Sequence, residues 1–168
     1  CGEESALMSS LMGERGQPRL KAPHAPLPVI SGVWDSPTLI HNVETYAVVP
    51  HVIAKGGSWY ASIGTESSKG TKLFSISGHV AKPGNYEIEF GTTPLELIAM
   101  AGGVIGGKLK AVIPGGSSAP VVPGAQMMDL TMDYDSIAKA GSMLGSGAVI
   151  VMNETRCMVR ALERLSYF

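Results

Sequence analysis

The most constraining feature of the chain is residues 71–116, where two strand patterns, a helix and a third strand follow one another with readable boundaries. Apolar and polar residues alternate over 72–80 and again over 86–90, as they do in half-buried strands. Lys82-Pro83-Gly84-Asn85 lies between them and suits a type II turn, with Gly84 at positive φ. We therefore expect an antiparallel hairpin.

A helix and a returning strand follow the hairpin. Thr93 can cap the helix, Pro94 suits its first position, and Glu96 can complete a capping box. The residues expected on its buried face are Leu95, Ile98 and Ala99. Gly102-Gly103 predicts the helix end, and residues 109–113 read as the third strand. Two strands, a crossing helix and a returning strand make a small β-grasp-like unit.

Residues 115–118, Gly-Gly-Ser-Ser, have the composition of a phosphate loop but lack the Lys-Ser/Thr pair of a P-loop. No helix pattern follows them directly. A tight chain reversal is therefore the preferred interpretation, and phosphate binding is the alternative.

Composition narrows the class of protein. With 168 residues, 45% of them hydrophobic and 16% charged, the chain can bury a core in one or two domains. The formal net charge of -1 shows no basic excess for nucleic acid, and no apolar run approaches the roughly 18 residues that span a bilayer. Cys1 and Cys157 offer no disulfide framework or thiolate metal site, so the chain reads as intracellular, with both thiols as small apolar filler.

The first residues predict a helix that begins with two carboxylates, Glu3 and Glu4. The apolar residues at helical spacing are Ala6, Leu7 and Leu11. Acids in a first turn favour the helix dipole, which is their structural interpretation. In the functional alternative, both acids face a cleft and accept hydrogen bonds from a ligand.

Residues 15–37 contain five prolines with interleaved basic residues, a density that excludes helix and most sheet pairing. A segment of this kind is functional or a linker. Its His24 and Trp34 can stack on a ring, although surface aromatics that merely cover a loop are commoner.

A second helix is expected after Asn42, which can cap it, with a kink or break at Pro50. The residues expected on its buried side are Val43, Ala47, Val48, Val52 and Ile53. Gly56-Gly57 ends this segment, and the polar residues 64–70 form a flexible joint that we take as a domain boundary.

The last third predicts a short extended piece at 127–132, a helix over 136–140 capped by Asp135, and a buried strand at 147–152. We expect this strand to belong to a larger sheet than that of the β-grasp-like unit. Residues 154–168 read as an amphipathic helix without a stop signal. Its residues expected to face inward are Met158, Ala161, Leu162 and Leu165. The first residue is not Met, so we expect a piece of a longer polypeptide.

Several groups of residues together resemble the NADH-binding flavoprotein subunit of respiratory complex I, in the family's order and over nearly the whole chain. They are residues 2–7, 17–19, 37–38 with 42–45, 77–78 with 82–84, and 113–118. The resemblance implies an α/β (α+β) fold with the end of an FMN- and NADH-binding domain over 1–66 and a soluble-ligand-binding (SLBB) β-grasp domain over 67–122. A connector and buried strand follow at 123–153, and a helical iron–sulfur domain begins at 154–168.

The resemblance also implies site residues. Glu3 and Glu4 match the family's acidic pair beside flavin and nicotinamide, Asn42 matches the second of two asparagines that hold FMN, and Thr45 lies in the same flavin-facing stretch. Three positions depart from the family pattern. His41 replaces the first asparagine, His24 replaces an aromatic that stacks on the NADH adenine, and Ser5 replaces threonine. No residue of this chain is implied in covalent catalysis or metal binding, because the glycine-rich flavin loop and the cluster cysteines are expected outside it.

The function implied is NADH dehydrogenase (NADH:quinone oxidoreductase) chemistry, in which the intact protein oxidises NADH through FMN and passes electrons to a [4Fe-4S] cluster. The implied partners are other subunits of the peripheral arm, notably the small [2Fe-2S] subunit, with no nucleic acid and no direct membrane insertion. The implied location is cytoplasmic, at the inner face of the cell membrane, or the matrix side in mitochondria. Two alternatives stay open: the diaphorase subunit of an NAD-linked hydrogenase or formate dehydrogenase, and a non-enzymatic β-grasp binding module, which would not need Glu3, Glu4 or Asn42.

Overall fold

The computed structural model describes residues 2–21, 23 and 26–167. The chain divides into two compact units, residues 1–51 (unit 1) and residues 52–168 (unit 2), and each is described by itself. Among the residues described, no helix is both long and apolar enough to cross a membrane.

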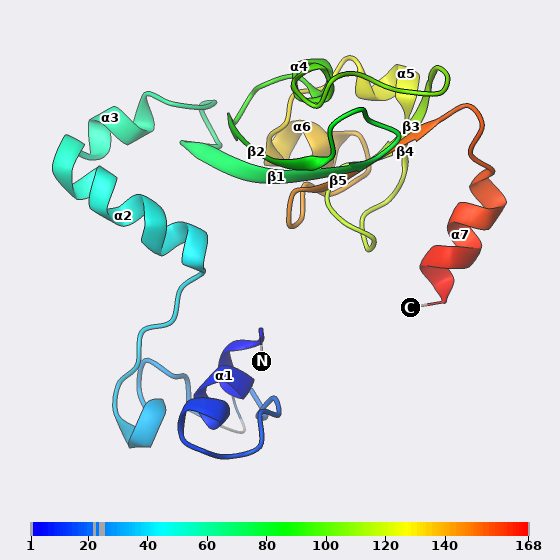
Figure 1. Ribbon diagram of the computed structural model, residues 1–168. Coiled ribbons are helices and arrows are strands. Elements are labelled where there is room, and N and C mark those ends of the chain that lie inside the picture. Colours follow the sequence, from blue (N-terminus) through cyan, green and yellow to red (C-terminus); the bar gives the residue numbers. More distant parts are fainter. Residues whose placement is uncertain (1, 22, 24–25, 168) are drawn as a thin grey trace. The chain divides into compact units, whose positions relative to one another are not determined.

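Unit 2 is built on one mixed sheet (Figure 1). Within the described residues its order is β2-β1-β5-β3-β4, with β1 and β5 parallel and the other neighbours antiparallel. The strands are β1 (Thr71–Gly78), β2 (Gly84–Glu89), β3 (Leu109–Ile113), β4 (Val122–Pro123) and β5 (Ala148–Asn153). The expected α/β class, the hairpin and the third strand are confirmed.

Strand β5 belongs, as expected, to a sheet larger than the three strands of the β-grasp-like unit. It joins those strands directly, because it lies between β1 and β3 and pairs with both. Its continuous apolar sequence follows from this central position, where Val149 and Val151 are buried against one face and Met152 against the other.

The turn of the hairpin also differs from the expectation. Gly84 is the first residue of β2, and the glycine at positive φ is Gly78, at the end of β1. A Cβ at Gly78 would lie 2.2 Å from the carbonyl oxygen of Val151. The backbone of β5 therefore approaches β1 so closely at Gly78 that only glycine fits. Gly84 instead pairs with Ile76 in the hairpin and has no positive φ.

Helix α4 (Pro94–Met100) begins as predicted. The Thr93 hydroxyl oxygen accepts from the Glu96 N–H, and the Glu96 carboxylate accepts from the Thr93 N–H at 2.8 Å, which completes the capping box. The buried face is one position away from the prediction. Leu97 and Ile98 are buried, whereas Leu95 and Ala99 are exposed.

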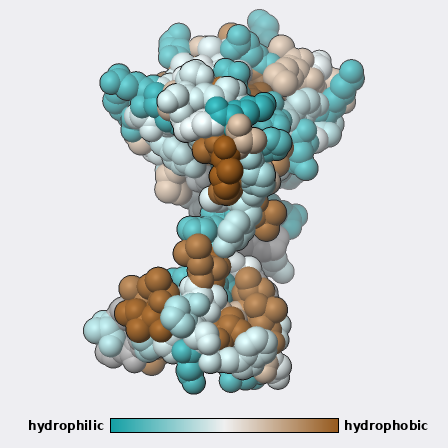
Figure 2. Space-filling view, turned by 90° about the vertical axis from the view of Figure 1, so that its left-hand side faces the viewer, coloured by the Kyte–Doolittle hydropathy of each residue, from teal (hydrophilic) through white to brown (hydrophobic). Residues whose placement is uncertain are grey.

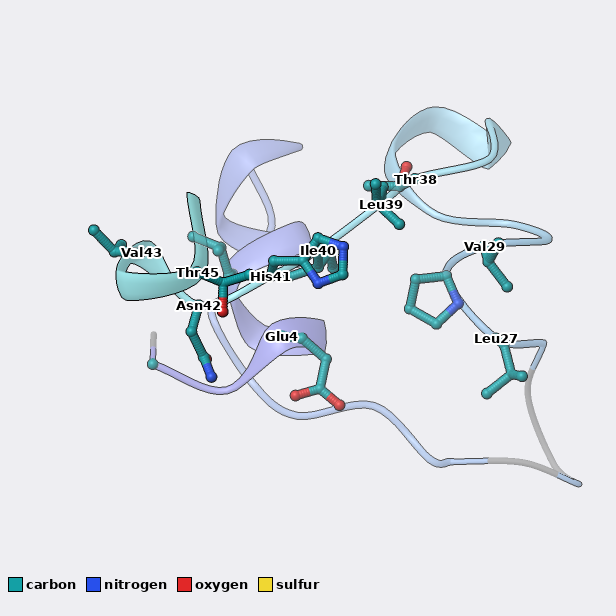
Figure 3. Close-up of a pocket in the computed structure, with 13 residues that line it drawn as sticks. Glu4, Leu27, Val29, Thr38, Leu39, Ile40, His41, Asn42, Val43 and Thr45 are labelled. Carbon is teal, nitrogen blue, oxygen red and sulfur yellow. The ribbon is translucent and has the colours of Figure 1, made fainter. Parts of the chain in front are cut away.

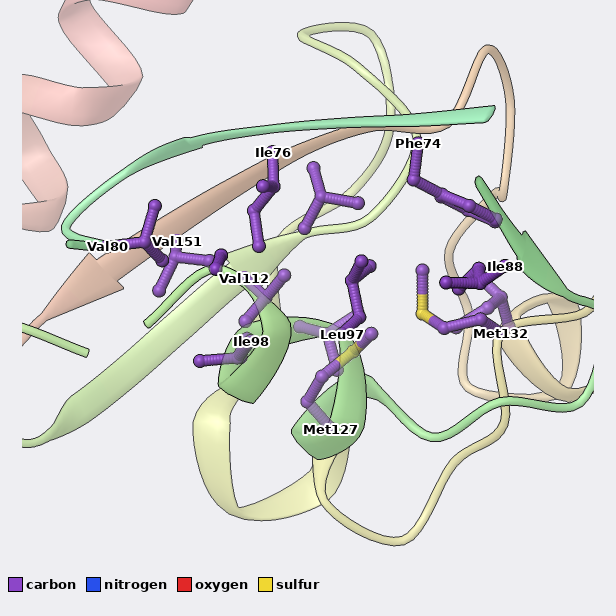
Figure 4. Packing of buried hydrophobic residues seen from close by; sticks show 14 of the residues in the cluster. Phe74, Ile76, Val80, Ile88, Leu97, Ile98, Val112, Met127, Met132 and Val151 are labelled. Carbon is purple, nitrogen blue, oxygen red and sulfur yellow. The ribbon is translucent and has the colours of Figure 1, made fainter. Parts of the chain in front are cut away.

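Three short helices cover one face of the sheet: α4, α5 (Gly124–Met127) and α6 (Tyr134–Lys139). In Figure 4, Leu97 and Ile98 of α4 and Met127 of α5 lie on the side of the sheet toward which Ile76 of β1 points, and Phe74 of β1 lies beside Ile88 and Met132 in the same cluster. The expectation of a short extended piece at 127–132 was wrong, because Met127 is the last residue of α5. Asp133, and not Asp135, caps α6 by accepting the Ser136 N–H at 2.8 Å.

The other face of the sheet carries a smaller cluster that includes helix α7 (Met158–Ser166). Ala161 is buried there, and Met158 and Leu165 pack against it, as predicted. Leu162 is exposed, contrary to the prediction. Cys157 is also exposed, at the N-cap of α7, so its interpretation as apolar filler was wrong.

Unit 1 contains α1 (Glu4–Leu11), the 3-10 turn η1 (Val33–Asp35) and the first part of α2 (Val43–Lys55), which continues into unit 2 before α3 (Gly57–Ala61). Helix α2 runs through Pro50 without the expected break. None of its residues is buried, and Val43 is 84% exposed, so the predicted buried side was wrong. In α1 the buried apolar residues are Ala6 and Met8 rather than Leu7 and Leu11. Figure 2 shows in brown the apolar surface on the face that it displays.

Candidate functional site

Glu3 is fixed by the start of α1. Its carboxylate Oε2 accepts the Ala6 N–H at 2.9 Å and the Ser5 hydroxyl at 2.6 Å. These contacts, with the Ser5 hydroxyl first and the Ala6 N–H second, hold the pKa of Glu3 below its usual range. Glu3 therefore acts as the helix cap, and Glu4 follows in the first turn, next to the positive end of the helix.

Ser5 also ties the proline-rich segment to α1. Its hydroxyl oxygen accepts the backbone N–H of Arg19 at 2.8 Å, while the Arg19 side chain donates to Ser9 at 2.9 Å and pairs with Glu14 at 3.0 Å. Ser5 and Ser9 are both buried. Residues 15–21 are thus held beside the acidic pair by hydrogen bonds rather than by apolar packing.

Lys21 is a site residue that sequence reasoning missed. Its Nζ lies 3.3 Å from Glu4 Oε1 and 3.9 Å from Glu3 Oε1. Because the Lys21 side chain is 72% exposed, these ion pairs add little stability, on the order of 0–1 kcal/mol. Their effect is on the charge of the site: one cation partly neutralises two carboxylates. In the sequence, Lys21 was one of the basic residues interleaved with the prolines of residues 15–37, a segment for which no helix or strand was predicted.

The proline-rich segment closes on itself before α2. The Thr38 N–H donates to the Pro28 carbonyl at 2.9 Å, and the Gly32 N–H donates to the Ser36 carbonyl at 2.8 Å. A Cβ on Gly32 would lie 2.3 Å from Thr38 Oγ1, so this closure requires glycine. The loop brings residues 27–29 to the same hollow as residues 38–45.

This hollow has a volume of about 680 Å³ and brings together four of the six predicted site residues, Glu4, His41, Asn42 and Thr45. In Figure 3 the Glu4 carboxylate and the His41 and Asn42 side chains lie on one side, and Leu27 and Val29 lie on the other. The site therefore offers carboxylate, imidazole, amide and hydroxyl groups opposite an apolar wall. This composition suits a planar, amide-bearing ring.

The other two predicted residues are Glu3 and His24. Glu3 lines an adjacent hollow of about 270 Å³ together with Arg19 and Lys21. His24 lies outside the described residues. Trp34 is 74% exposed and adopts a left-handed conformation with φ 48°, so it stacks on none of the described rings.

The other candidate motifs have structural explanations. Residues 115–118 form the expected chain reversal, in which the Ala119 N–H donates to the Gly116 carbonyl at 2.9 Å. Within residues 2–21, 23 and 26–167, no group of three or more His, Cys, Asp or Glu side chains lies together as metal ligands do.

Comparison with known proteins shows what the chain is similar to. The SLBB domain model matches residues 72–151, which include β1 to β4 and most of β5. Over its whole length the chain is 49% identical to an F subunit of NADH-quinone oxidoreductase from Rhizobium meliloti (strain 1021) and covers 39% of that protein. It is 50% identical over its whole length to the F subunit of NADH-quinone oxidoreductase from Rickettsia felis, of which it covers 40%.

A solved structure agrees. An NAD+-reducing [NiFe]-hydrogenase in the air-oxidized state matches 96% of this chain and 27% of its own chain, with a TM-score of 0.80 and 33% identity. The chain spans about two fifths of the length of the curated relatives it matches. Its residues 72–151 match the SLBB domain model, and over its whole length it is similar to a segment of the F subunits of NADH-quinone oxidoreductases.

Proposed function

We propose that the intact protein is an NADH dehydrogenase subunit that oxidises NADH through FMN and passes electrons to a [4Fe-4S] cluster for delivery to quinone. The observation that carries this proposal is about 50% identity to NADH-quinone oxidoreductase F subunits over every part of the chain. The hollow in unit 1 supports it, because four residues expected from the family line that hollow together.

The residues present fit the two ring systems. Flavin and nicotinamide both carry amide groups, which hydrogen-bond to carboxylate and amide side chains. Asn42, Thr45 and His41 would hold the flavin, and Glu4 would orient the nicotinamide. When bound, FMN supplies hydride acceptance and stepwise release of electrons. The protein contributes binding and orientation.

The acidic pair would also select the nucleotide. Glu3 and Glu4 oppose additional negative charge, and Lys21 neutralises them only in part. An extra 2′-phosphate near these groups is therefore unfavourable, and NADH is preferred over NADPH. His24 would stack on the adenine.

We further propose the domain boundaries given above: the nucleotide domain over 1–66, the β-grasp domain over 67–122, a connector and strand over 123–153, and the start of the helical domain over 154–168. The cluster ligands would lie outside this chain. The partners would be the small [2Fe-2S] subunit and other subunits of a peripheral arm at the inner face of the membrane, or at the matrix side in mitochondria.

The alternative of a hydrogenase diaphorase subunit fits the similarity to the NAD+-reducing [NiFe]-hydrogenase structure. That similarity does not favour the alternative over the main proposal. A formate dehydrogenase diaphorase would share the same site. A non-enzymatic β-grasp module is less well supported, because Glu4 and Asn42 lie together outside the region that the SLBB model matches.

The proposal is tested by NADH oxidation with ferricyanide as acceptor, using the natural full-length protein. Glu4→Gln should raise the NADPH rate relative to the NADH rate. The matched control is Glu66→Gln, an exposed carboxylate in unit 2, which should leave the ratio unchanged. Equal NADH preference in the wild-type protein and Glu4→Gln would contradict the assigned role of the acidic pair.

A further inference from the structure

Unit 2 contains a second hollow that the proposed function does not use. It lies between α7 and the face of the sheet opposite α4, α5 and α6, and has a volume of about 390 Å³. The apolar side chains that line it include Ile113, Ile150, Met152 and Leu165. Small-molecule sites commonly fall in this range of size and have such a lining, with few polar groups.

The polar groups at this hollow are mainly cationic. Arg156 and Arg164 line it from the α7 side, and His79 lines it from the end of β1. His79 Nδ1 lies 3.3 Å from the Val151 carbonyl oxygen, a contact that fixes the ring. No acidic residue lines the hollow among the described residues.

The arginines are available for a ligand. Arg156 and Arg164 also line an adjoining polar hollow with Arg160 and Glu163. Among the residues that the structure describes, no ion pair joins these three guanidinium groups to a carboxylate. The nearby Lys110 adds positive charge, with its Nζ 2.7 Å from the Arg156 carbonyl oxygen.

We propose that this hollow binds an amphiphile with one anionic headgroup and an apolar chain. The chain lies on Ile150, Met152 and Leu165, and the headgroup is held by Arg156 and Arg164 at the boundary between the apolar and polar hollows. Guanidinium groups bind both carboxylate and phosphate oxygens in a bidentate manner, so either headgroup satisfies the site. None of the residues that line this hollow belongs to the proposed nucleotide site in unit 1.

The test is isothermal titration calorimetry of the natural full-length protein with decanoate, decyl phosphate, decyltrimethylammonium and inorganic phosphate, each below its micelle concentration. We expect saturable binding of one anionic amphiphile per chain. Comparison of decanoate with decyl phosphate distinguishes the two headgroup sources. Inorganic phosphate and the cationic amphiphile should not bind measurably. Shortening the chain should weaken binding by about fourfold per methylene.

Arg156→Ala/Arg164→Ala should weaken binding by about tenfold or more, because charge-assisted hydrogen bonds are lost. Lys139→Ala, a surface cation at the end of α6, is the matched control and should bind as the wild-type protein does. Both arginines are exposed, so the double variant is expected to fold, which its circular dichroism checks. The proposal is overturned by absence of saturable binding, equal binding of the cationic amphiphile, or unchanged affinity in the double variant.

Discussion

The two units of this chain are stabilised in different ways. Unit 2 encloses a cluster of apolar side chains between its sheet and three helices, including fully buried Phe74, Leu97 and Met127. In unit 1 the buried apolar residues of α1 are only Ala6 and Met8, and hydrogen bonds from Ser5 and Arg19 hold the loop in place. Unit 2 therefore has its own core, whereas unit 1 presents polar and apolar side chains outward, as a binding surface does.

The largest expected effect is in the core of unit 2. Phe74 is 0% exposed, and Phe74→Ala should lower the free energy of unfolding by about 3–5 kcal/mol, through lost burial and a cavity. The control in unit 1 is Leu11→Ala. Because Leu11 is 62% exposed, this substitution should change the free energy of unfolding by less than about 0.5 kcal/mol. Urea denaturation measures both. Similar losses in the two variants would show that unit 1 has an apolar core too.

The next effect concerns the backbone of unit 2. Gly78→Ala combines a left-handed φ of 89° with a Cβ 2.2 Å from the Val151 oxygen. Gly103→Ala shares the left-handed backbone, with φ 81°, but its Cβ meets open space. Gly103→Ala should cost about 1–2 kcal/mol, and Gly78→Ala about twice as much, in thermal or urea unfolding. Equal costs would mean that β5 moves aside without penalty.

In unit 1 the expected losses come from hydrogen bonds. Ser5→Ala leaves the Arg19 N–H without its acceptor and removes one of the two hydrogen bonds to the Glu3 carboxylate, which should cost about 1–3 kcal/mol. Ser10→Ala, an exposed residue of the same helix, is the control. The rate of limited proteolysis within 15–37 measures the opening of the loop. If this rate is unchanged in Ser5→Ala, the hydrogen bonds do not hold the segment.

The rate of loop opening should also depend on pH, and Ser5→Ala tests this dependence. Because the folded-state pKa of Glu3 is lowered, its contribution to stability is present above its ordinary value of about 4.3 and is lost as the pH falls through the lower folded value. Loop opening should therefore accelerate on acidification in the wild-type protein. In Ser5→Ala the main cause of the lowered Glu3 pKa is gone, so the rate of loop opening should increase less on acidification. An identical pH profile would contradict this role for Ser5.

The smallest expected effect is at the surface of unit 2. The N–H groups of Arg160 and Val159 lower the pKa of the Cys157 thiol, with smaller contributions from Lys110 and Arg156. Alkylation by iodoacetamide should therefore begin at lower pH in the folded protein than in urea, where the thiol pKa is about 8.5. Arg156→Ala should move the profile only slightly. Coincident folded and unfolded profiles would rule out the helix contribution.

Sequence patterns predicted unit 2 better than unit 1, for a physical reason. In unit 2 the apolar periodicity reflects a core made by the same residues, so β1, β2, β3 and the Thr93 capping box were predicted correctly. Two of the errors there, at Gly84 and at Asp135, arose where strand pairing or a nearby alternative cap competed with the local signal. In α2 the apolar pattern predicted a buried face, but no residue of this helix is buried.

The candidate site was predictable only through the resemblance to a family, in which His41 is a departure from the pattern. Glu4 is far in sequence from residues 41–45, and the fold of unit 1 brings them to one hollow. Lys21 was missed because no periodic pattern fixes the course of a proline-rich segment. The hollow beside Arg156 and Arg164 was not predicted, because it forms only where the sheet faces α7.

The most direct test of the proposed function is a visible absorption spectrum of the natural full-length protein, recorded before and after anaerobic addition of NADH. We expect flavin bands that bleach on NADH addition over a broad iron–sulfur background. A colourless protein that does not respond to NADH, even after reconstitution with FMN, iron and sulfide, would contradict the proposal. Glu3 and Glu4 would then be partners of the helix dipole alone.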